Sequence, residues 1–519
     1  MMKSRIQPCL LALAALISTA SAADLRLPRV FSDHMVLQRD KPVKVWGWAD
    51  KGEKITVEFA GQTKTATAAA DGAWLATLDP MPVNATGRVL SVKADSVNRK
   101  SEISDVLVGD VWLLGGQSNM EFGLNDRIVG GKEAAAAANH PILRWMAVAT
   151  EARPDVTNDI PVALSSDWKK PCGEWRVCTP ENVPKFSAVG YFFAREVQAE
   201  TKVPIGLLEC CWGGTCAEAW VSRQTLTDLH VKMIDELLAG FDQKAAAWDA
   251  NPVKEDPRRN RGWPGGCYNA MVYPIRNFAI RGALFYQGEN NAVDGDRFLP
   301  YAQTYPAVIQ QWRRDFDAPD LPFCIIQMAP WNSKAKSLDK GINNPSCFVR
   351  EAHLKTHLSV PHTGMVVTMD VGRVGNMHPH DKAPVGKRAA NWALSEVYGV
   401  KDRPWRGPVY SDFAVNGNRA VIRFQKEGLK PPFRLQKPEG KMDAFIIAGA
   451  DKVWHLAEAE IKGETVEVWS ADVATPVAVR YAWCNLFKQV NLIVDADGLP
   501  ASPFRTDDWP VVTVPKAKK

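Results

Sequence analysis

Four short clusters of small and polar residues each follow an apolar or turn-rich stretch, and their residue types suit nucleophilic catalysis. The clusters are GGQSNM (115–120), WGGT (212–215), YQGENN (286–291) and NMHP (376–379). A serine at the turn between a buried strand and a helix is exposed, with backbone N–H groups nearby to receive an oxyanion. The first cluster therefore predicts Ser118 as a nucleophile. The last predicts His378 as the base that activates it and later protonates the leaving alcohol.

The second and third clusters can supply hydrogen-bond donors to a developing negative charge. Paired glycines let the backbone approach a substrate closely, so the amide of Gly213 or Gly214 can donate beside that of Ser118. Asn291 can add a side-chain donor, and the adjacent Asn290 is the alternative. These residues form the predicted oxyanion hole.

Each of these residues also has a simpler structural explanation. Ser118 taken alone would be a helix cap, His378 a packed or solvated histidine, and Asn291 a turn residue. The chemical interpretation rests on the recurrence of such clusters along the chain. The cysteine and histidine spacings fit no zinc pattern, so no metal is expected.

The sequence around these clusters predicts the elements that position them. Nearly unbroken apolar runs are typical of strands buried on both faces of a parallel sheet. Between 106 and 402 they recur as VLVGDVWLLGG, VPIGLLECCW, AIRGALFYQGE, LPFCIIQMAP and TGMVVTMDVG. Amphipathic stretches such as VGYFFAREVQAE separate them and predict helices. The pattern indicates an open α/β sheet with ligand chemistry outside the carboxyl ends of its strands.

Two β-rich regions are expected on either side of this α/β part. The 519 residues exceed what one hydrophobic core usually serves, so two or three domains are expected. Residues 23–105 contain short runs of alternating polarity separated by turn residues, which predict a small antiparallel β-sandwich. Residues 403–519 show the same pattern of short strand-like runs separated by turn residues, which predicts a second β-domain.

The first 22 residues have the pattern of a secretory signal peptide. Lys3 and Arg5 precede the apolar run 9–17, and Ala20-Ser21-Ala22 offers a small-residue cleavage site. A transmembrane anchor would need about 20 apolar residues. We therefore expect a secreted or periplasmic protein without a membrane span.

Charge and cysteine content add two further expectations. The 63 Lys and Arg residues nearly balance the 58 Asp and Glu residues, which does not indicate a nucleic-acid partner. In an oxidising compartment, Cys172 and Cys178, which lie in a loop with proline and glycine, are predicted to form a disulfide.

The clusters together resemble those of a known family. GQSNM, WGGT with EAW, YQGENNA, and MHP with VGKRAA match, in order, the sequence blocks of the SGNH hydrolases in the form of the sialate O-acetylesterase-like carbohydrate esterases. The segments LPRVFSDHMVLQRDKPVKVWGWA, VREAH, RYAWCN and GLPASPFRTDDW extend the resemblance over nearly the whole chain after the leader.

The resemblance implies a fold and an activity. The fold would be an SGNH-type (flavodoxin-like) parallel-sheet hydrolase domain between two β-sandwich-like domains. The activity would be that of a serine esterase that removes O-acetyl groups from sugars through an acetyl-serine intermediate. Ser118 would be the nucleophile and His378 the base, with Gly213 or Gly214 and Asn291 in the oxyanion hole. No metal or organic cofactor is implied.

The acid that would orient the histidine is left open. The wider SGNH group commonly carries Asp three positions before the catalytic histidine, and Gly375 stands there in this sequence. Asp370, at the end of a buried run, is one candidate and Glu289 is another, and a backbone carbonyl is the third possibility. Glu289 and Gln117 are also predicted to hold the site loops from behind.

The substrate is left open among several acetylated carbohydrates. Sialic acid esters and acetylated plant or bacterial polysaccharides such as xylan both fit. The 19 tryptophans suit stacking against sugar rings or packing in β-domains. A different class, a carbohydrate-binding protein with a weak esterase centre, is the alternative if the histidine lacks an orienting partner.

Overall fold

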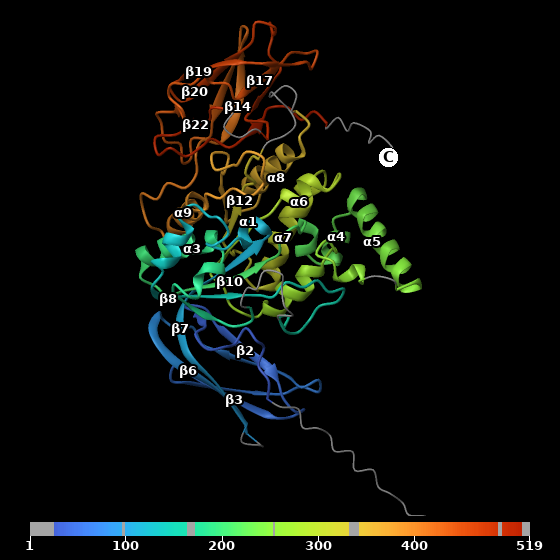
Figure 1. Ribbon diagram of the computed structural model, residues 1–519, viewed down its shortest axis with the longest axis vertical. Helices are drawn as coiled ribbons and strands as arrows, with labels where there is room; N and C mark the ends of the chain where they lie inside the picture. The colour runs from blue at the N-terminus through green and yellow to red at the C-terminus, as the bar shows by residue number, and fades with distance from the viewer. Residues whose placement is uncertain are drawn as a thin grey trace, which may run out of the picture.

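Three regions follow one another along the long axis of the molecule (Figure 1). The computed structural model describes residues 25–95, 99–162, 172–252, 255–331, 342–485 and 490–510. The predicted signal peptide, residues 1–22, lies outside the described residues. In the described part, no helix is both long and apolar enough to cross a bilayer.

The middle region is built on a parallel sheet. Its strands are β7 (Arg99–Gly116), β8 (His140–Ala147), β10 (Ile205–Cys211), β11 (Gly282–Tyr286), β12 (Phe323–Ile326) and β13 (Thr363–Val366). They lie in the order β13-β12-β11-β7-β10-β8, every neighbouring pair is parallel, and the short β9 (Arg176–Cys178) adds an antiparallel edge. Without β8, this is the doubly-wound order in which the first strand lies between the second and third. The predicted α/β sheet is present.

Helices cover both faces of this sheet. On one face, α3 (Ala188–Thr201) packs against α9 (Ala383–Trp392), and on the other α7 (Tyr301–Asp315) packs against α8 (Pro345–Ser359). The end of β7 contributes side chains to the hydrophobic layers on both faces of the sheet. Trp112 and Leu114 belong to one hydrophobic cluster, and Val111 and Leu113 belong to the other. A strand buried on both faces explains the unbroken apolar run in its sequence.

Further helices and single turns connect this framework. The helices are α1 (Ser118–Glu121), α2 (Gly131–Ala136), α4 (Arg223–Thr227), α5 (Lys232–Ala250) and α6 (Glu289–Val293). Single turns of 3₁₀ or π-helix are η1 (Val183–Lys185), η2 (Ala217–Trp220), η3 (Pro257–Arg259), η4 (Tyr268–Val272), η5 (Tyr273–Ile275) and η6 (Ala393–Val397). Of these, α1 and α6 begin directly after strands β7 and β11.

The N-terminal region is antiparallel, apart from the parallel pairing of β1 with β7. Its strands are β1 (Val36–Gln38), β2 (Val43–Trp48), β3 (Lys54–Phe59), β4 (Gln62–Thr67), β5 (Ala73–Leu78) and β6 (Asn84–Ala94). Strand β7 pairs with β6 in this region and then continues into the central sheet. The predicted boundary between residues 105 and 106 therefore falls inside one continuous strand.

The C-terminal region contains two four-stranded antiparallel sheets and a small pair. The first sheet is β14 (Tyr410–Asn416), β15 (Arg419–Phe424), β20 (Thr465–Trp469) and β19 (Glu458–Lys462). The second is β18 (Trp454–Leu456), β17 (Phe445–Ala448), β21 (Ala478–Tyr481) and β23 (Phe504–Arg505), and β16 (Arg434–Leu435) pairs with β22 (Ile493–Val494). These sheets agree with the predicted β-rich end of the chain.

The predicted bridge between Cys172 and Cys178 is wrong. The structure contains no disulfide between these two cysteines. Cys178 is fixed in β9 opposite His140 of β8, and its side chain is buried in the hydrophobic layer on the α3 side of the sheet. Its role there is that of a small apolar residue.

Candidate active site

The strand order brings the predicted clusters together. In a doubly-wound sheet, ligands bind outside the carboxyl ends of the strands, at the point where the strand order reverses. Here that point lies between β7 and β11, which end at Gly116 and Tyr286. Ser118 follows the first strand and α6 follows the second. Gly116 is required at this edge, because a Cβ there would lie 2.2 Å from the Tyr286 carbonyl oxygen.

Ser118 and His378 form a close pair. The Ser118 Oγ lies 2.8 Å from Nε2 of His378, although 260 residues separate them. Ser118 begins α1, while His378 lies in the loop between β13 and α9. The ring of Phe122 packs on the imidazole with the centroids 4.8 Å apart. This is the hydrogen-bond distance that a nucleophile and its base require.

The imidazole is neutral over most of the pH range. Burial lowers the pKa of His378 to about 4, and the nearby cations Lys382 and His380 lower it in the same direction. At neutral pH, Nε2 is therefore free to accept a proton from Ser118.

Asp370, predicted as a candidate orienting acid, is engaged elsewhere. Its two oxygens accept hydrogen bonds of 2.8 and 2.6 Å from the two terminal nitrogens of Arg388. Among the described residues, no carboxylate hydrogen-bonds to His378; the backbone N–H of His378 donates to the Asn376 side chain at 2.9 Å. The structure thus does not bring Asp370 together with the histidine, because a charged arginine is a stronger partner for it.

Gly213 lies beside the nucleophile. A Cβ placed on Gly213 would be 3.3 Å from the Ser118 Cβ, so the two residues are in contact. The Gly213 amide donates to a Glu121 oxygen at 2.7 Å. This backbone donor therefore already holds an anionic oxygen next to Ser118. Gly214, the other predicted glycine, has φ +77° and lies under the side chain of Arg261.

Asn291 is a structural residue, contrary to the prediction. It is fully buried, and its Oδ1 accepts hydrogen bonds from the Ala217 amide and from Gln287, each 2.9 Å long. Its Nδ2 donates to Glu218, whose other partner is Arg297. The second N–H of Nδ2 donates to the Arg297 carbonyl oxygen at 3.4 Å, so no donor is left for an oxyanion.

The adjacent Asn290, weighed as the alternative, is half-buried at the start of α6. Its side-chain Nδ2 contacts Cys216 Sγ at 3.1 Å, and its backbone N–H donates to Gln117 Oε1 at a distance of 3.4 Å. Gln117 is buried directly before Ser118 and also accepts from Gln287 at 3.3 Å. Gln117, directly before Ser118, therefore accepts hydrogen bonds from both Asn290 and Gln287.

Sequence reasoning missed two buried residues behind the pair, Asn119 and Lys382. Asn119 donates to Glu289 Oε1 at 2.5 Å and accepts from Lys382 Nζ at 2.6 Å. Glu289 is thus bound to Asn119 and not to the histidine. The signal for Lys382 was its place in an otherwise apolar helix start, close after the MHP motif.

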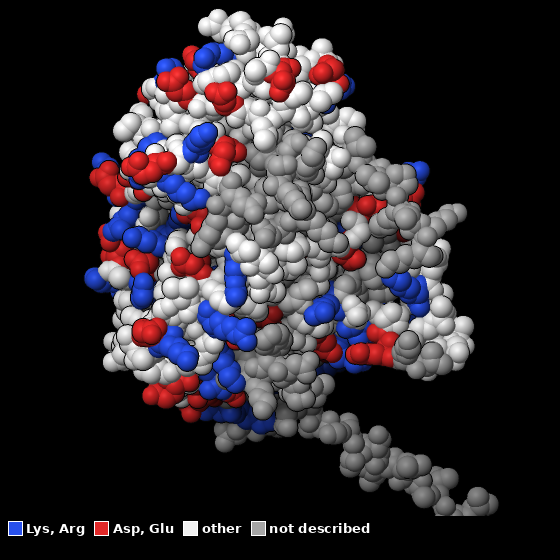
Figure 2. All heavy atoms as spheres, turned by 45° about the horizontal axis from the view of Figure 1, so that its top comes forward, with Lys and Arg blue, Asp and Glu red and all other residues white. Residues whose placement is uncertain are grey.

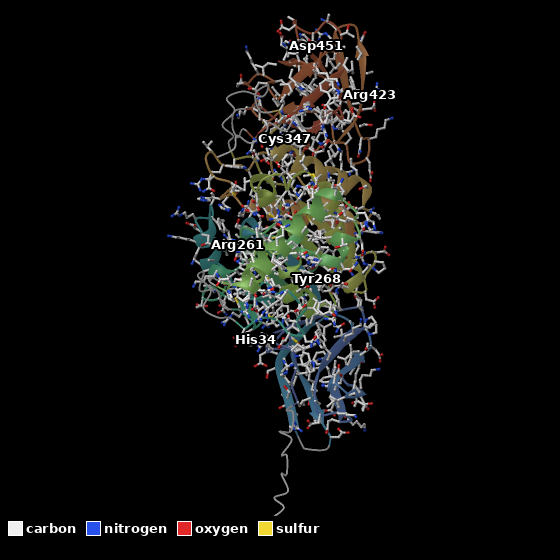
Figure 3. All side chains as sticks on the ribbon, turned by 90° about the vertical axis from the view of Figure 1, so that its right-hand side faces the viewer. His34, Arg261, Tyr268, Cys347, Arg423 and Asp451 are labelled. Atoms are coloured by element: carbon white, nitrogen blue, oxygen red, sulfur yellow. The ribbon has the colours of Figure 1, made fainter. Side chains whose placement is uncertain are left out.

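One exposed cation borders the site. Arg261 donates from Nη1 to the Gly213 carbonyl oxygen at 3.1 Å, and Figure 3 labels it in the middle region of the molecule. Within the described ranges, no carboxylate lies at ion-pair distance from it. In the same part of the chain, no group of three or more His, Cys, Asp or Glu side chains is arranged to hold a metal.

Comparison with known proteins places this chain among the carbohydrate esterases. The family model described as "Carbohydrate esterase, sialic acid-specific acetylesterase" matches residues 108–250 and 254–395, more than half of the chain. The chain therefore belongs to the sialic acid-specific acetylesterase family of carbohydrate esterases, and it is an esterase.

Full-length relatives agree with this assignment. The chain is 28% identical over 513 residues to the sialate O-acetylesterase of Pongo abelii, covering 92% of each. It is 27% identical over 533 residues to that of Mus musculus, covering 95% of this chain and 96% of the other. The chain is also 35% identical in sequence to a carbohydrate acetylesterase from Xanthomonas citri with a known crystal structure. The two structures superpose with a TM-score of 0.79, and the match covers 93% of this chain and 100% of that one.

Proposed function

We propose that the protein hydrolyses O-acetyl esters of sugars through an acetyl-serine intermediate. The observation that carries this proposal is the 2.8 Å distance between Ser118 Oγ and His378 Nε2, with the Gly213 amide alongside. In the first step, Oγ bonds to the acetyl carbonyl carbon while Nε2 takes the hydroxyl proton. The carbon–oxygen bond to the sugar then breaks, and the imidazolium protonates the sugar oxygen. Water, deprotonated by His378, releases acetate in the second half.

The oxyanion of each tetrahedral intermediate would be held by three donors. The Gly213 and Ser118 amides supply the backbone hydrogen bonds, and Asn290 supplies the side-chain one. In the free protein the Glu121 carboxylate accepts from Gly213, so the substrate carbonyl oxygen takes its place. The affinity of this amide for an anionic oxygen supports the assignment.

We propose an acidic acetylated sugar, such as an O-acetylated sialic acid, as substrate. The charged groups that act on His378 and His380 are all cationic and include Lys382, Arg373 and Arg127. The Arg261 guanidinium is exposed and donates to the carbonyl of Gly213, which is in contact with Ser118. Together these cations suit a carboxylate on the sugar, and the names of the curated relatives agree. Acetylated xylan has no carboxylate on its xylose units and would not use Arg261.

We also propose that the protein is exported. The support is the leader-like sequence of residues 1–22.

Figure 2 shows acidic and basic side chains intermixed on the face it displays, which fits a small uncharged or singly charged ligand better than nucleic acid.

Acetate release by the protein and by Ser118→Ala tests the proposal. The substrates are 4-nitrophenyl acetate, 9-O-acetylated sialic acid and acetylated xylan. The matched control is Ser411→Ala, because Ser411 is exposed in the C-terminal region. We expect Ser118→Ala to lose at least about 10³-fold in rate and the control to lose nothing. Sugar binding without acetate release from any substrate would instead favour a binding protein with a silent centre.

A further inference from the structure

Lys382 is a buried lysine that the catalytic steps above do not use. It directly precedes α9, its side chain is fully buried, and its Nζ donates to Asn119 Oδ1 at 2.6 Å. The same nitrogen lies 5.2 Å from the centre of the Tyr286 ring. Burying an ammonium group is costly, so its presence behind the site requires an explanation.

Asn119 connects this lysine to both members of the reacting pair. It follows Ser118 directly, and its side-chain amide donates to the Met377 carbonyl at 3.0 Å and to Glu289 at 2.5 Å. With Lys382 on its oxygen, every hydrogen-bonding position of the amide group except one lone pair is used. One side chain thus ties the residue after the nucleophile to the residue before His378.

The charged and polar groups around this network come from four segments. Around His378 these are Ser118 from α1, the Phe122 ring directly after α1, and Lys382 and His380 from its own segment. The Glu121 carboxylate of α1 lies beside Ser118, on the Gly213 amide. Around Lys382 these are Asn119 from α1, Tyr286 at the end of β11, and Glu289 from α6. Of the two carboxyls, Glu289 is bound to Asn119 and Glu121 to the Gly213 amide.

We propose that Lys382, acting through Asn119, is a positioning residue for the Ser118–His378 pair, whose histidine accepts no carboxylate partner among the described residues. It fixes the Ser118 and His378 segments against each other, and its positive charge keeps the imidazole neutral until it reacts. This inference rests on the proposed roles of Ser118 and His378. A histidine held next to a cation gives its proton readily to the sugar oxygen as the ester breaks.

The protonation states agree with this arrangement. Burial lowers the pKa of Lys382 to about 7 and raises that of Glu289 above its ordinary value. At the acidic pH where His378 begins to take up a proton, Lys382 is therefore charged, and Glu289 takes up its proton at a higher pH than an ordinary glutamate does. Lys382 and His380 both act on the imidazole in the same direction, toward a lower pKa of His378.

The test is the variant Lys382→Met, with Lys387→Met as the matched control on the exposed side of α9. The acid limb of kcat/KM is measured with 4-nitrophenyl acetate, and the His378 titration is followed by NMR. We expect both to move to higher pH by about one unit, because a like charge has been removed. We also expect kcat to fall about tenfold or more, with KM changed less than threefold, since positioning is lost. The control should change neither value.

An unchanged acid limb and an unchanged His378 titration in folded Lys382→Met would overturn the proposal. If that variant does not fold, Lys382→Gln removes the charge and can still donate to Asn119. Independently of any variant, a His378 pKa near 6.5 in the unmodified protein would also contradict it. The NMR titration does not depend on turnover. Failure of this inference is therefore distinguishable from failure of the esterase mechanism, which Ser118→Ala tests.

Discussion

Two fully buried glutamates near α6 each hold an asparagine side chain, but different cations accompany them. Glu218 binds Asn291 and pairs directly with Arg297, with Nη2 and Oε2 3.1 Å apart. Glu289 binds Asn119, whose oxygen, rather than the glutamate, receives Lys382. Arginine cannot lose its proton in a protein, whereas a buried lysine can. The first network therefore fixes structure, and the second can respond to charge beside the reacting pair.

Removing Arg297, the partner of Glu218, should have the largest effect on the stability of the protein. Arg297→Met leaves the Glu218 carboxylate buried without its cation, so we expect a loss of about 3–5 kcal/mol in the free energy of unfolding. Urea denaturation measures it, with Arg259→Met, an exposed arginine in η3, as control. A loss no larger than that of the control would show that the two networks do not differ as described.

The neighbouring asparagines should separate catalysis from stability. Asn290→Ala should lower kcat about 10²-fold or more, because one oxyanion donor is lost, with little change in stability. Asn291→Ala should instead lower the free energy of unfolding by about 1–3 kcal/mol, since Glu218 loses a buried partner. Steady-state kinetics and denaturation of both variants provide the check. The reverse pattern would restore Asn291 to the oxyanion hole.

Acid should destabilise the protein through its buried histidines. Burial lowers the pKa of His357 and of His378 to about 4 and that of His353 to about 3. Between about pH 6.5 and pH 4 the unfolded chain binds these protons and the folded protein does not, so stability falls as the pH falls. Each histidine contributes at most about 1.4 kcal/mol per pH unit. Denaturation at pH 7 and pH 5 measures this, and equal stability at both would contradict it.

Arg261 should have the smallest effect, and only on acidic substrates. Arg261→Gln removes the cation beside Gly213, so KM for 9-O-acetylated sialic acid should rise about tenfold. The KM for 4-nitrophenyl acetate, which carries no carboxylate, should stay the same. A matching rise for both substrates would assign Arg261 to the shape of the loop instead.

Most of the sheet could be predicted from sequence, because a strand that is buried on both faces appears in the sequence as an unbroken apolar run. The run ending β7 alternates between the two hydrophobic layers, and every residue from Val111 to Leu114 is apolar. The continuity of β7 across residues 105 and 106 could not be seen, because its first half is polar and exposed on alternate residues. A change in burial within one strand resembles a change of domain.

The reacting pair was predictable, but its partners were not. Ser118 and His378 stand out by their place after the apolar runs. Asn290 and Asn291 are adjacent in one helical turn and point about 100° apart, so burial decides between them. That decision depends on Glu218, 73 residues away. Likewise, Asp370 is satisfied by Arg388 on the following helix, a contact that sequence spacing alone does not reveal.

In the proposed mechanism, Ser118 carries the acetyl group between the two halves of the reaction. The most direct measurement is rapid acid quenching of the protein with 4-nitrophenyl acetate, followed by mass spectrometry of its peptides. We predict one added acetyl group on the peptide that contains Ser118, and none on that peptide in Ser118→Ala. Continued acetate release with an acetyl group on another residue, or with no acetylated peptide at all under burst conditions, would contradict the account.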